Sequence, residues 1–253
     1  MMEAQPLVSV IMPSYNAEKY IAESIESVLH QTYANWELVI TDDCSTDRTT
    51  DIVKSYCQQD QRIDFVVAER HSGIAGTRNQ SITRAKGRFV AFLDNDDLWM
   101  PEKLEKQVNF MLETGCAFSY SEYELMKEDG TPKGKVIKTA GEINYNKYLR
   151  NTIIGSGTIM LDTEKTGSLH MPDNATSDDM ALWCKILKDG HNAHPIKEVL
   201  MKYRVRNNSA SANKWKAAKD VWRVYRQQEK LPFFIASACF VCYAFNAIIK
   251  RVF

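Results

Sequence analysis

Short apolar runs alternate with segments of helical periodicity over the first 115 residues of the chain. The apolar runs lie at 7–12, 36–40, 63–67 and 89–93, and they predict four buried strands. The intervening segments repeat apolar residues every three or four positions and predict helices after Asn16, the expected N-cap, at 47–57, at 74–86 and after Pro101. This alternation with short connections predicts an α/β fold, with a mostly parallel sheet flanked by helices.

The pattern is looser after residue 115. The polar segment 127–135 predicts a hairpin turn, and the segment 153–161, with Gly155, Ser156 and Gly157, predicts a strand of small residues. Asp178 and Asp179 stand at the start of a further predicted helix, because apolar residues recur at helical spacing behind them.

The C-terminal residues differ from the rest of the chain. Residues 231–249 are almost entirely apolar and follow a predicted helix that is rich in Lys and Arg. Such a run suits an interfacial or re-entrant helix, which we favour, a membrane span, or a helix packed on the domain or on a second copy in a homodimer. We therefore predict a domain at 1–213 and a C-terminal helical, membrane-associating extension at 214–253.

Charge is distributed unevenly although the net charge is zero. Between Lys202 and Lys230 there are nine Lys or Arg residues and two acidic residues, which suggests an anionic partner, either a membrane surface or nucleic acid. The apolar run that follows favours the membrane, and we expect no nucleic-acid partner. The six cysteines lack the spacing of a disulfide framework, which indicates a reducing, cytosolic compartment.

The common nucleotide-binding loops are missing from the sequence. The G-x-G-x-x-G fingerprint does not follow the first strand and no P-loop is found, which argues against a nicotinamide enzyme and a P-loop kinase. Polar residues nevertheless follow three of the predicted strands, at 14–16, 42–43 and 94–97. Because ligands of parallel sheets bind beyond the carboxyl ends of the strands, these residues predict a binding site there.

Asp94 and Asp96 are the candidates for metal binding. Two carboxylates at close range repel each other and are tolerated when a cation lies between them. Their hard oxygen atoms suit Mg²⁺ or Mn²⁺ bridging a diphosphate. The alternative is an exposed acidic turn that caps the next helix, a role that would suffice for Asp97.

Five separated blocks make the sequence similar to a known family. They read V-S-V-I-M-P-S-Y-N at 8–16, T-D-D-C-S-T-D-R-T at 41–49, G-I-A-G-T-R-N at 73–79, F-L-D-N-D-D at 92–97 and S-D-D-M-A-L-W at 177–183. Together and in this order they resemble the family-2 glycosyltransferases, inverting enzymes with the Rossmann-like GT-A fold, over residues 6–210.

The resemblance implies a role for each matching residue. Nucleotide-sugar binding is implied for Pro13, Tyr15 and Asn16 around the base, Asp42 and Asp43 at the uracil or ribose, Arg78 near the diphosphate, and Asn95. Asp94 is implied at the ribose and the metal, and Asp96 at the metal. Asp179 matches the catalytic base, with Asp178 before it, and a carboxylate at a helix N-terminus is well placed to accept a proton.

Three positions depart from the family pattern. Cys44 stands where Gly is usual, and Asp178 stands where Glu is usual. Arg206 occupies the place of a histidine that can help to bind metal or diphosphate. An arginine cannot ligate a metal, but it can pair with a diphosphate directly.

The resemblance implies a metal-dependent, inverting transfer of a sugar from a UDP-sugar. The basic and apolar C-terminus suggests a lipid-diphosphate-linked saccharide acceptor, as in O-antigen or capsule synthesis, at the cytoplasmic face of the inner membrane. A nucleotidyltransferase that makes nucleotide sugars is one alternative, although the segment after the first strand lacks its Gly-rich signature. A non-catalytic, membrane-bound UDP-binding scaffold is the other.

Overall fold

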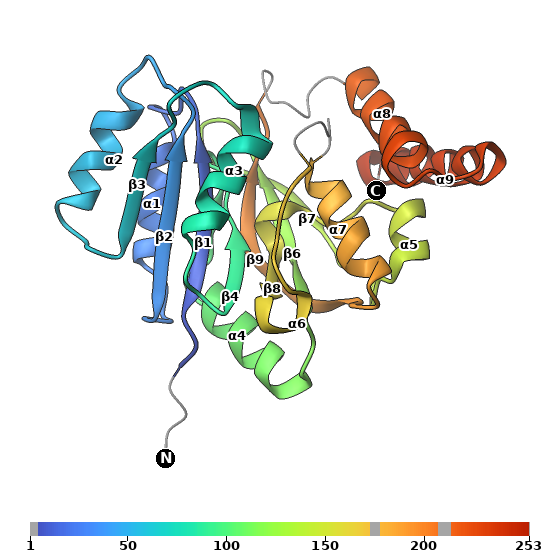
Figure 1. Cartoon of the computed structure of the whole chain (residues 1–253), viewed down its shortest axis with the longest axis horizontal. Helices are drawn as coiled ribbons and strands as arrows, with labels where there is room; N and C mark the ends of the chain where they lie inside the picture. The colour runs from blue at the N-terminus through green and yellow to red at the C-terminus, as the bar shows by residue number, and fades with distance from the viewer. Residues whose placement is uncertain (1–4, 173–177, 207–213, 253) are drawn as a thin grey trace.

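The structure is a computed structural model that describes residues 5–172, 178–206 and 214–252. A nine-stranded sheet runs through the molecule, and helices cover both of its faces (Figure 1). The strand order is β3-β2-β1-β4-β8-β6-β9-β5, and β7 pairs with β6. The predicted α/β fold with flanking helices is confirmed.

The first half of the chain forms the parallel part of the sheet. Its elements are β1 (Val8–Ser14), α1 (Ile21–Leu29), β2 (Trp36–Asp42), α2 (Thr49–Cys57), β3 (Ile63–Val67), α3 (Gly73–Arg84) and β4 (Phe89–Phe92). Strand β1 pairs in parallel with β2 and β4, and β2 pairs in parallel with β3. Each of these elements coincides with a predicted one to within a few residues, because the apolar runs are short and the connections are tight.

The second half mixes parallel and antiparallel pairing. Its elements are β5 (Leu98–Trp99), α4 (Lys103–Thr114), β6 (Phe118–Met126), β7 (Pro132–Ile137), α5 (Tyr145–Arg150), the 3₁₀ turn η1 (Ser156–Thr158), β8 (Ile159–Asp162), α6 (Thr163–Thr166), α7 (Asp178–Lys188) and β9 (Ala193–Arg204). Strand β8 is antiparallel to β4 and β6, whereas β9 is parallel to β6. Parallel pairing therefore dominates only the first half of the sheet.

Three local predictions have different outcomes in the structure. The hairpin around 127–135 is confirmed, since β6 and β7 pair antiparallel across it. The strand predicted at 153–161 begins only at Ile159, because residues 156–158 form a 3₁₀ turn instead. The prediction that Asn16 caps α1 is wrong: the helix begins at Ile21, and the Asn16 side chain accepts a hydrogen bond from the Thr46 amide at 2.9 Å.

The alternation of side chains along the strands divides the core into two halves. Val8, Val10 and Met12 face one side of β1, where apolar residues of α1, α2 and α4 cover them. Ile11 faces the other side, together with residues of α3, α5 and α7. A central strand that is covered on both faces must be apolar throughout, which explains the continuous run of β1.

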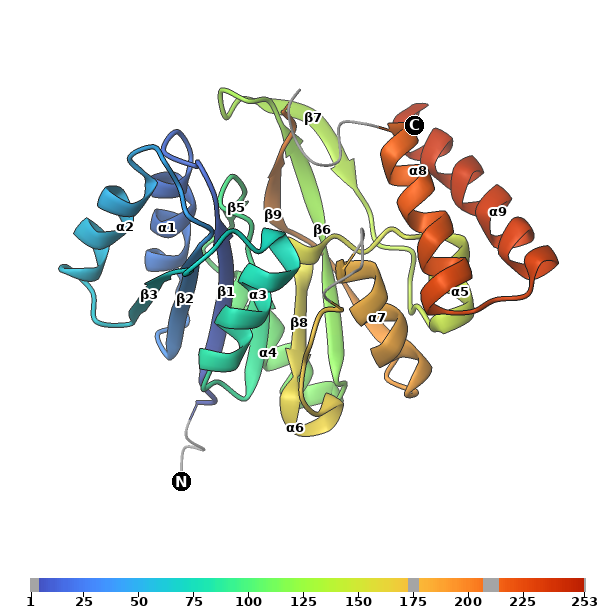
Figure 2. The ribbon, with the colours of Figure 1, turned by 45° about the horizontal axis from the view of Figure 1, so that its top comes forward.

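The C-terminal helices join the second half of the core. They are α8 (Lys214–Arg223), the π-helical turn η2 (Val224–Gln228) and α9 (Phe233–Val252). They lie beside α5 and α7 at one side of the sheet (Figure 2), and Val221, Val224 and Tyr225 are buried there. Across the described residues, α9 included, we find no helix with the length and apolarity that crossing a membrane requires. The boundary at 213/214 stays a prediction.

Candidate active site

The acidic segment that follows β4 meets two arginines. Asp94 Oδ1 lies 2.6 Å from Nη2 of Arg78, which projects from α3, and Asp96 Oδ2 lies 2.6 Å from Nη2 of Arg206, which follows β9. Arg78 is 4% exposed and is therefore not an ordinary charge on a helix surface. The two candidate metal ligands are thus each held by a guanidinium group from a distant part of the chain.

Burial and mutual repulsion act on the acidic segment together. Burial, and after it the negative charge of Asp94, raise the pKa of Asp96 to about 6, although Arg206 opposes this shift. Asp97 is almost fully buried, and burial raises the pKa of its carboxyl group well above the usual range. Its Oδ1 accepts a hydrogen bond from the backbone N–H of Arg204 at 2.8 Å, so it anchors β9 and does not cap α4.

These carboxylates suit a divalent cation. Asp94 and Asp96 offer hard oxygen atoms, and the repulsion of Asp94, which after burial raises the pKa of Asp96, is one that a cation between them would relieve. Within the described parts of the chain, no three His, Cys, Asp or Glu side chains are grouped so as to hold a metal by themselves. The residues therefore fit a cation that takes its remaining ligands from phosphate oxygens and water.

A second arginine, Arg204, contacts the backbone of the acidic segment. Arg204 is buried and donates from Nε to the backbone carbonyl of Asp96 at 2.8 Å, while its Nη2 lies 2.7 Å from Oε2 of Glu23. The Tyr20 ring lies beneath both arginines, with Cζ to centroid distances of 5.0 Å for Arg204 and 5.2 Å for Arg206. Strand β9 thereby fixes the position of the acidic segment through its last residues.

Both acidic residues of the D-D pair that follows β2 hold neighbouring loops in place. Asp42 is buried, and its carboxylate accepts hydrogen bonds from the hydroxyls of Ser14 (2.9 Å) and Ser45 (2.6 Å) and from the Ser45 amide (2.7 Å). Asp43 accepts from the amides of Ser72 at 2.7 Å and Gly73 at 2.8 Å, at the start of α3. Both carboxylates therefore order the loops around the predicted base pocket, whatever contact they make with a nucleotide.

Cys44 lies at a position where the backbone favours glycine. Its φ is +64°, in the left-handed region that few residues with a Cβ adopt. The family's usual glycine at this position therefore has a conformational reason, and the cysteine accepts some strain there.

An aromatic pair stands at the same edge of the sheet. Tyr15 is half exposed, and its ring centroid lies 4.9 Å from that of His71 at a tilt of 53°. His71 Nδ1 lies 3.0 Å from Oδ2 of Asp43. The Asn95 side chain donates to the Pro13 carbonyl at 3.1 Å, which links the loop after β1 to the acidic segment.

Asp179 is held from the 3₁₀ turn η1. Its Oδ2 accepts a hydrogen bond from the Ser156 hydroxyl at 2.8 Å, and its Oδ1 accepts from the Met180 amide at 2.7 Å. Asp178 is the first residue of α7, and its side chain lies outside the described residues. The carbonyl of Gly157 in the same turn accepts from the buried Trp99 indole at 2.8 Å, so Trp99 is a packing residue beneath the turn.

A cavity of about 50 Å³ joins the acidic segment to this turn. It is lined by Asp94, Asp97, Tyr123, Gly155, Ser156, Gly157, Thr158, Met201 and Tyr203. A Cβ atom on Gly157 would lie 2.6 Å from the Met201 Cε atom, so the glycine permits the close approach of the turn to β9. Asp94 therefore lines the same cavity as Ser156, whose hydroxyl group donates a hydrogen bond to Asp179.

Comparison with known proteins identifies the family. The sequence profile of glycosyl transferase family 2 matches residues 9–166. The chain is 52% identical to TuaG of Bacillus subtilis (strain 168), a glycosyltransferase provisionally assigned to teichuronic acid biosynthesis, over 98% of each chain. It is 43% identical to WfgD of Escherichia coli, named as UDP-Glc:alpha-D-GlcNAc-diphosphoundecaprenol beta-1,3-glucosyltransferase, over 86% of this chain and 85% of WfgD. The chain therefore belongs to glycosyl transferase family 2, and it is a glycosyltransferase enzyme.

Solved structures show the same fold. S. aureus TarS 1–349 in complex with UDP-GlcNAc superposes with a TM-score of 0.71 at 24% identity, over 87% of this chain and 64% of TarS. The mannosyltransferase PcManGT from Pyrobaculum calidifontis, in complex with GDP-Man and Mn²⁺, gives 0.72 at 19% identity, over 98% and 72%. The predicted GT-A fold is confirmed.

The sequence did not reveal several residues that shape the site. Ser156, His71, Arg204 and Tyr20 act through contacts between segments that are distant along the chain. Of these, Arg204 carried a signal, since it stands two positions before the predicted site residue Arg206. The predicted roles of the nucleotide-binding and catalytic residues stay predictions.

Proposed function

We propose that this enzyme transfers a sugar, with inversion, from a UDP-sugar to a hydroxyl group of a lipid-diphosphate-linked saccharide. The transfer belongs to surface polysaccharide synthesis of the O-antigen or capsule type, at the cytoplasmic face of the membrane. One observation carries the proposal: Asp94 and Ser156, which supports Asp179, line the same cavity. The names of WfgD and of WfaP of Escherichia coli, which is 38% identical, support the donor and acceptor classes.

Inversion follows from a single displacement at the anomeric carbon. The acceptor oxygen forms its bond to this carbon while the bond to the diphosphate oxygen breaks on the opposite face. Asp179 accepts the proton of the acceptor hydroxyl, and a hydrogen bond holds its carboxylate to Ser156, which lines the cavity. The beta linkage in the name of WfgD supports this stereochemistry, since UDP-Glc carries an alpha linkage.

Arg78 and Arg206 bring positive charge to the diphosphate. Each guanidinium forms an ion pair with a carboxylate now, and planar guanidinium groups pair equally well with phosphate oxygens. When bound, a Mn²⁺ or Mg²⁺ ion held by Asp94 and Asp96 supplies further positive charge for the leaving diphosphate. The exposed Tyr15 ring and the neighbouring His71 ring offer a stacking surface for the base.

A donor screen tests the proposal. The purified enzyme would be incubated with UDP-, GDP- and dTDP-sugars, with Mn²⁺ and with a chelator, and the release of nucleoside diphosphate would be measured. We expect slow hydrolysis of a UDP-sugar that the chelator abolishes. Preference for a GDP- or dTDP-sugar, or hydrolysis that is indifferent to the chelator, would contradict the donor class or the metal requirement.

A further inference from the structure

The exposed apolar side chains of the described residues concentrate on the C-terminal helices. The large ones in this extension are Trp215, Phe233, Phe234, Ile235, Val241 and Phe245. Trp215 is 88% exposed and Phe234 is 85% exposed, whereas among the described residues outside the extension no large apolar side chain exceeds 49%. Exposed apolar residues that gather on one element mark an interaction surface.

Four residues of α9 form a continuous outer stripe. Phe234, Ala238, Val241 and Phe245 are spaced by four, three and four positions, so they lie on one face of the helix. The inner face packs on the protein: Ala236 and Cys239 are buried, and Phe240 lies edge-on to Trp222 of α8, with ring centroids 5.6 Å apart. The helix is therefore apolar on its exposed side as well as on its packed side.

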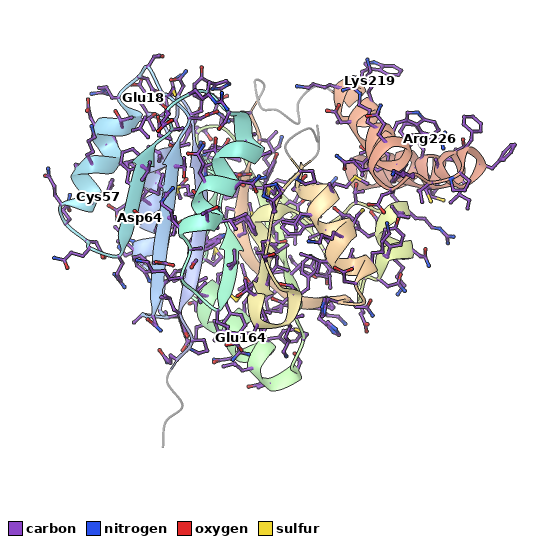
Figure 3. All side chains as sticks on the ribbon, in the orientation of Figure 1. Glu18, Cys57, Asp64, Glu164, Lys219 and Arg226 are labelled. Atoms are coloured by element: carbon purple, nitrogen blue, oxygen red, sulfur yellow. The ribbon has the colours of Figure 1, made fainter. Side chains whose placement is uncertain are left out.

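The segments of the extension that precede the stripe carry exposed basic side chains. Lys216, Lys219, Arg226 and Lys230 are exposed on α8, on η2 and before α9, and Figure 3 labels two of them. The two acidic residues of the described extension do not point freely into solvent. Asp220 is buried, and the Glu229 carboxylate, 8% exposed, lies 2.7 Å from the Lys188 ammonium of α7. The surface of the extension thus combines an apolar stripe on α9 with several exposed basic side chains.

We propose that the extension, through the α9 stripe and the four exposed basic residues that precede it in the chain, binds the face of an anionic phospholipid bilayer. Aromatic and aliphatic side chains enter the boundary between headgroups and acyl chains, and lysine and arginine pair with the anionic headgroups. A second copy of the chain suits the surface poorly, because a symmetric interface would bring the basic residues against themselves. The lipid character of the acceptor rests on the proposed function, whereas the docking surface does not.

Docking in this way brings the active site to the membrane. Helix α8 begins eight residues after Arg206, on the side of the molecule where the parallel strands end (Figure 1). Glu229 ties the extension to Lys188, the last residue of α7, and the opposite end of this helix carries Asp179. A bound extension therefore holds the catalytic edge of the sheet near the headgroup layer, where the diphosphate of a lipid-linked acceptor lies.

Flotation with liposomes tests the docking surface. The full-length protein would be mixed at low salt with vesicles of phosphatidylglycerol and phosphatidylcholine, and with vesicles of phosphatidylcholine alone. We expect flotation with the anionic vesicles that high salt weakens. Combined Phe234→Glu, Val241→Glu and Phe245→Glu substitutions should lower binding at least about tenfold, and Lys219→Gln with Lys230→Asn should lower it about fivefold per charge.

The control places two glutamates on exposed apolar residues elsewhere. Leu112→Glu on α4 and Val136→Glu on β7 should float like the wild type. Equal loss in this control, no flotation of the wild type, or a wild-type dimer that the triple substitution dissociates would overturn the proposal. Because flotation needs no catalysis, it decides the docking surface even if the enzyme hydrolyses no UDP-sugar. Conversely, a triple variant that keeps donor hydrolysis shows that its fold and its site are intact.

Discussion

The hydroxyl group of Ser156 donates a hydrogen bond to Oδ2 of Asp179 at 2.8 Å, across 23 residues of sequence. Asp179 lies in the first turn of α7, whose Met180 amide binds the other carboxylate oxygen. One oxygen is thus bound to the helix end and the other to the wall of the cavity. In the proposed mechanism, these two hydrogen bonds would hold the Asp179 carboxylate in place as the proton acceptor.

We expect Asp179→Asn to bind donor normally and to lose turnover by about 10²-fold or more, because the amide keeps the shape but accepts no proton. UDP binding by calorimetry and initial rates of transfer separate the two effects. Asp178→Asn is the matched control and should lose much less. A larger loss for Asp178→Asn would move the base by one position.

Ser156→Ala should lower kcat about threefold to tenfold while the KM for the donor stays the same. Removal of one hydrogen bond frees the carboxylate to rotate, which costs about 1 kcal/mol of orientation. Steady-state kinetics with a fixed acceptor measure this. Ser156→Thr should restore part of the loss, and an unchanged kcat in the alanine variant would show that the contact does not position the base.

Asp96→Ala should abolish the part of UDP binding that depends on Mn²⁺. The substitution removes one of two carboxylates and also releases Arg206, so that metal-independent binding remains. Calorimetry with and without Mn²⁺ distinguishes the two parts. Asp51→Ala on the outside of α2 serves as the control, and metal-dependent binding that survives in a folded Asp96→Ala variant would contradict the assignment.

The burial of Lys103 should make the free energy of unfolding depend on pH. It is fully buried beneath the site, with Nζ 4.1 Å from the Trp99 ring centroid, and burial holds its pKa well below the usual range. The folded protein then binds fewer protons than the unfolded chain up to the usual lysine pKa, so its stability rises with pH, by at most about 1.4 kcal/mol per unit.

Lys103→Met removes this dependence. In urea unfolding at pH 7, 8 and 9, the variant should be more stable than the wild type at pH 7, and the difference should shrink as the pH rises. Lys106→Met, on the exposed side of the same helix, should show a constant difference. A constant difference for Lys103→Met as well would mean that the buried ammonium keeps its proton.

The first half of the fold was predictable because local pattern and tertiary structure agree there. The runs at β1 and β2 are buried on both faces, and the helices between them carry one apolar stripe each. The second half was less predictable because its antiparallel strands pair over long distances. The segment 153–158 has the composition of a strand, but its glycines allow a turn that packs against Met201.

The sequence predicts which residues form the site, but it does not predict which of them contact one another. The acidic residues after β4 and the arginines at 78 and 206 are visible in the sequence, but their pairing depends on α3 and β9 meeting at one edge. Asn16 was misread as a helix cap because its true partner, the Thr46 amide, lies in another loop. The sequence alone does not show the outer stripe of α9, because the packing of Phe240 on Trp222 decides which face of the helix is exposed.

The linkage of the product tests the account most directly. The enzyme would be given a UDP-sugar and a diphosphate-linked N-acetylhexosamine with a short lipid, in the presence of Mn²⁺, and the anomeric coupling of the product would be measured by NMR. We expect one new beta linkage from the alpha-linked donor, and no product from Asp179→Asn. An alpha linkage, or transfer that is undiminished in Asp179→Asn, would contradict a single displacement with Asp179 as the base.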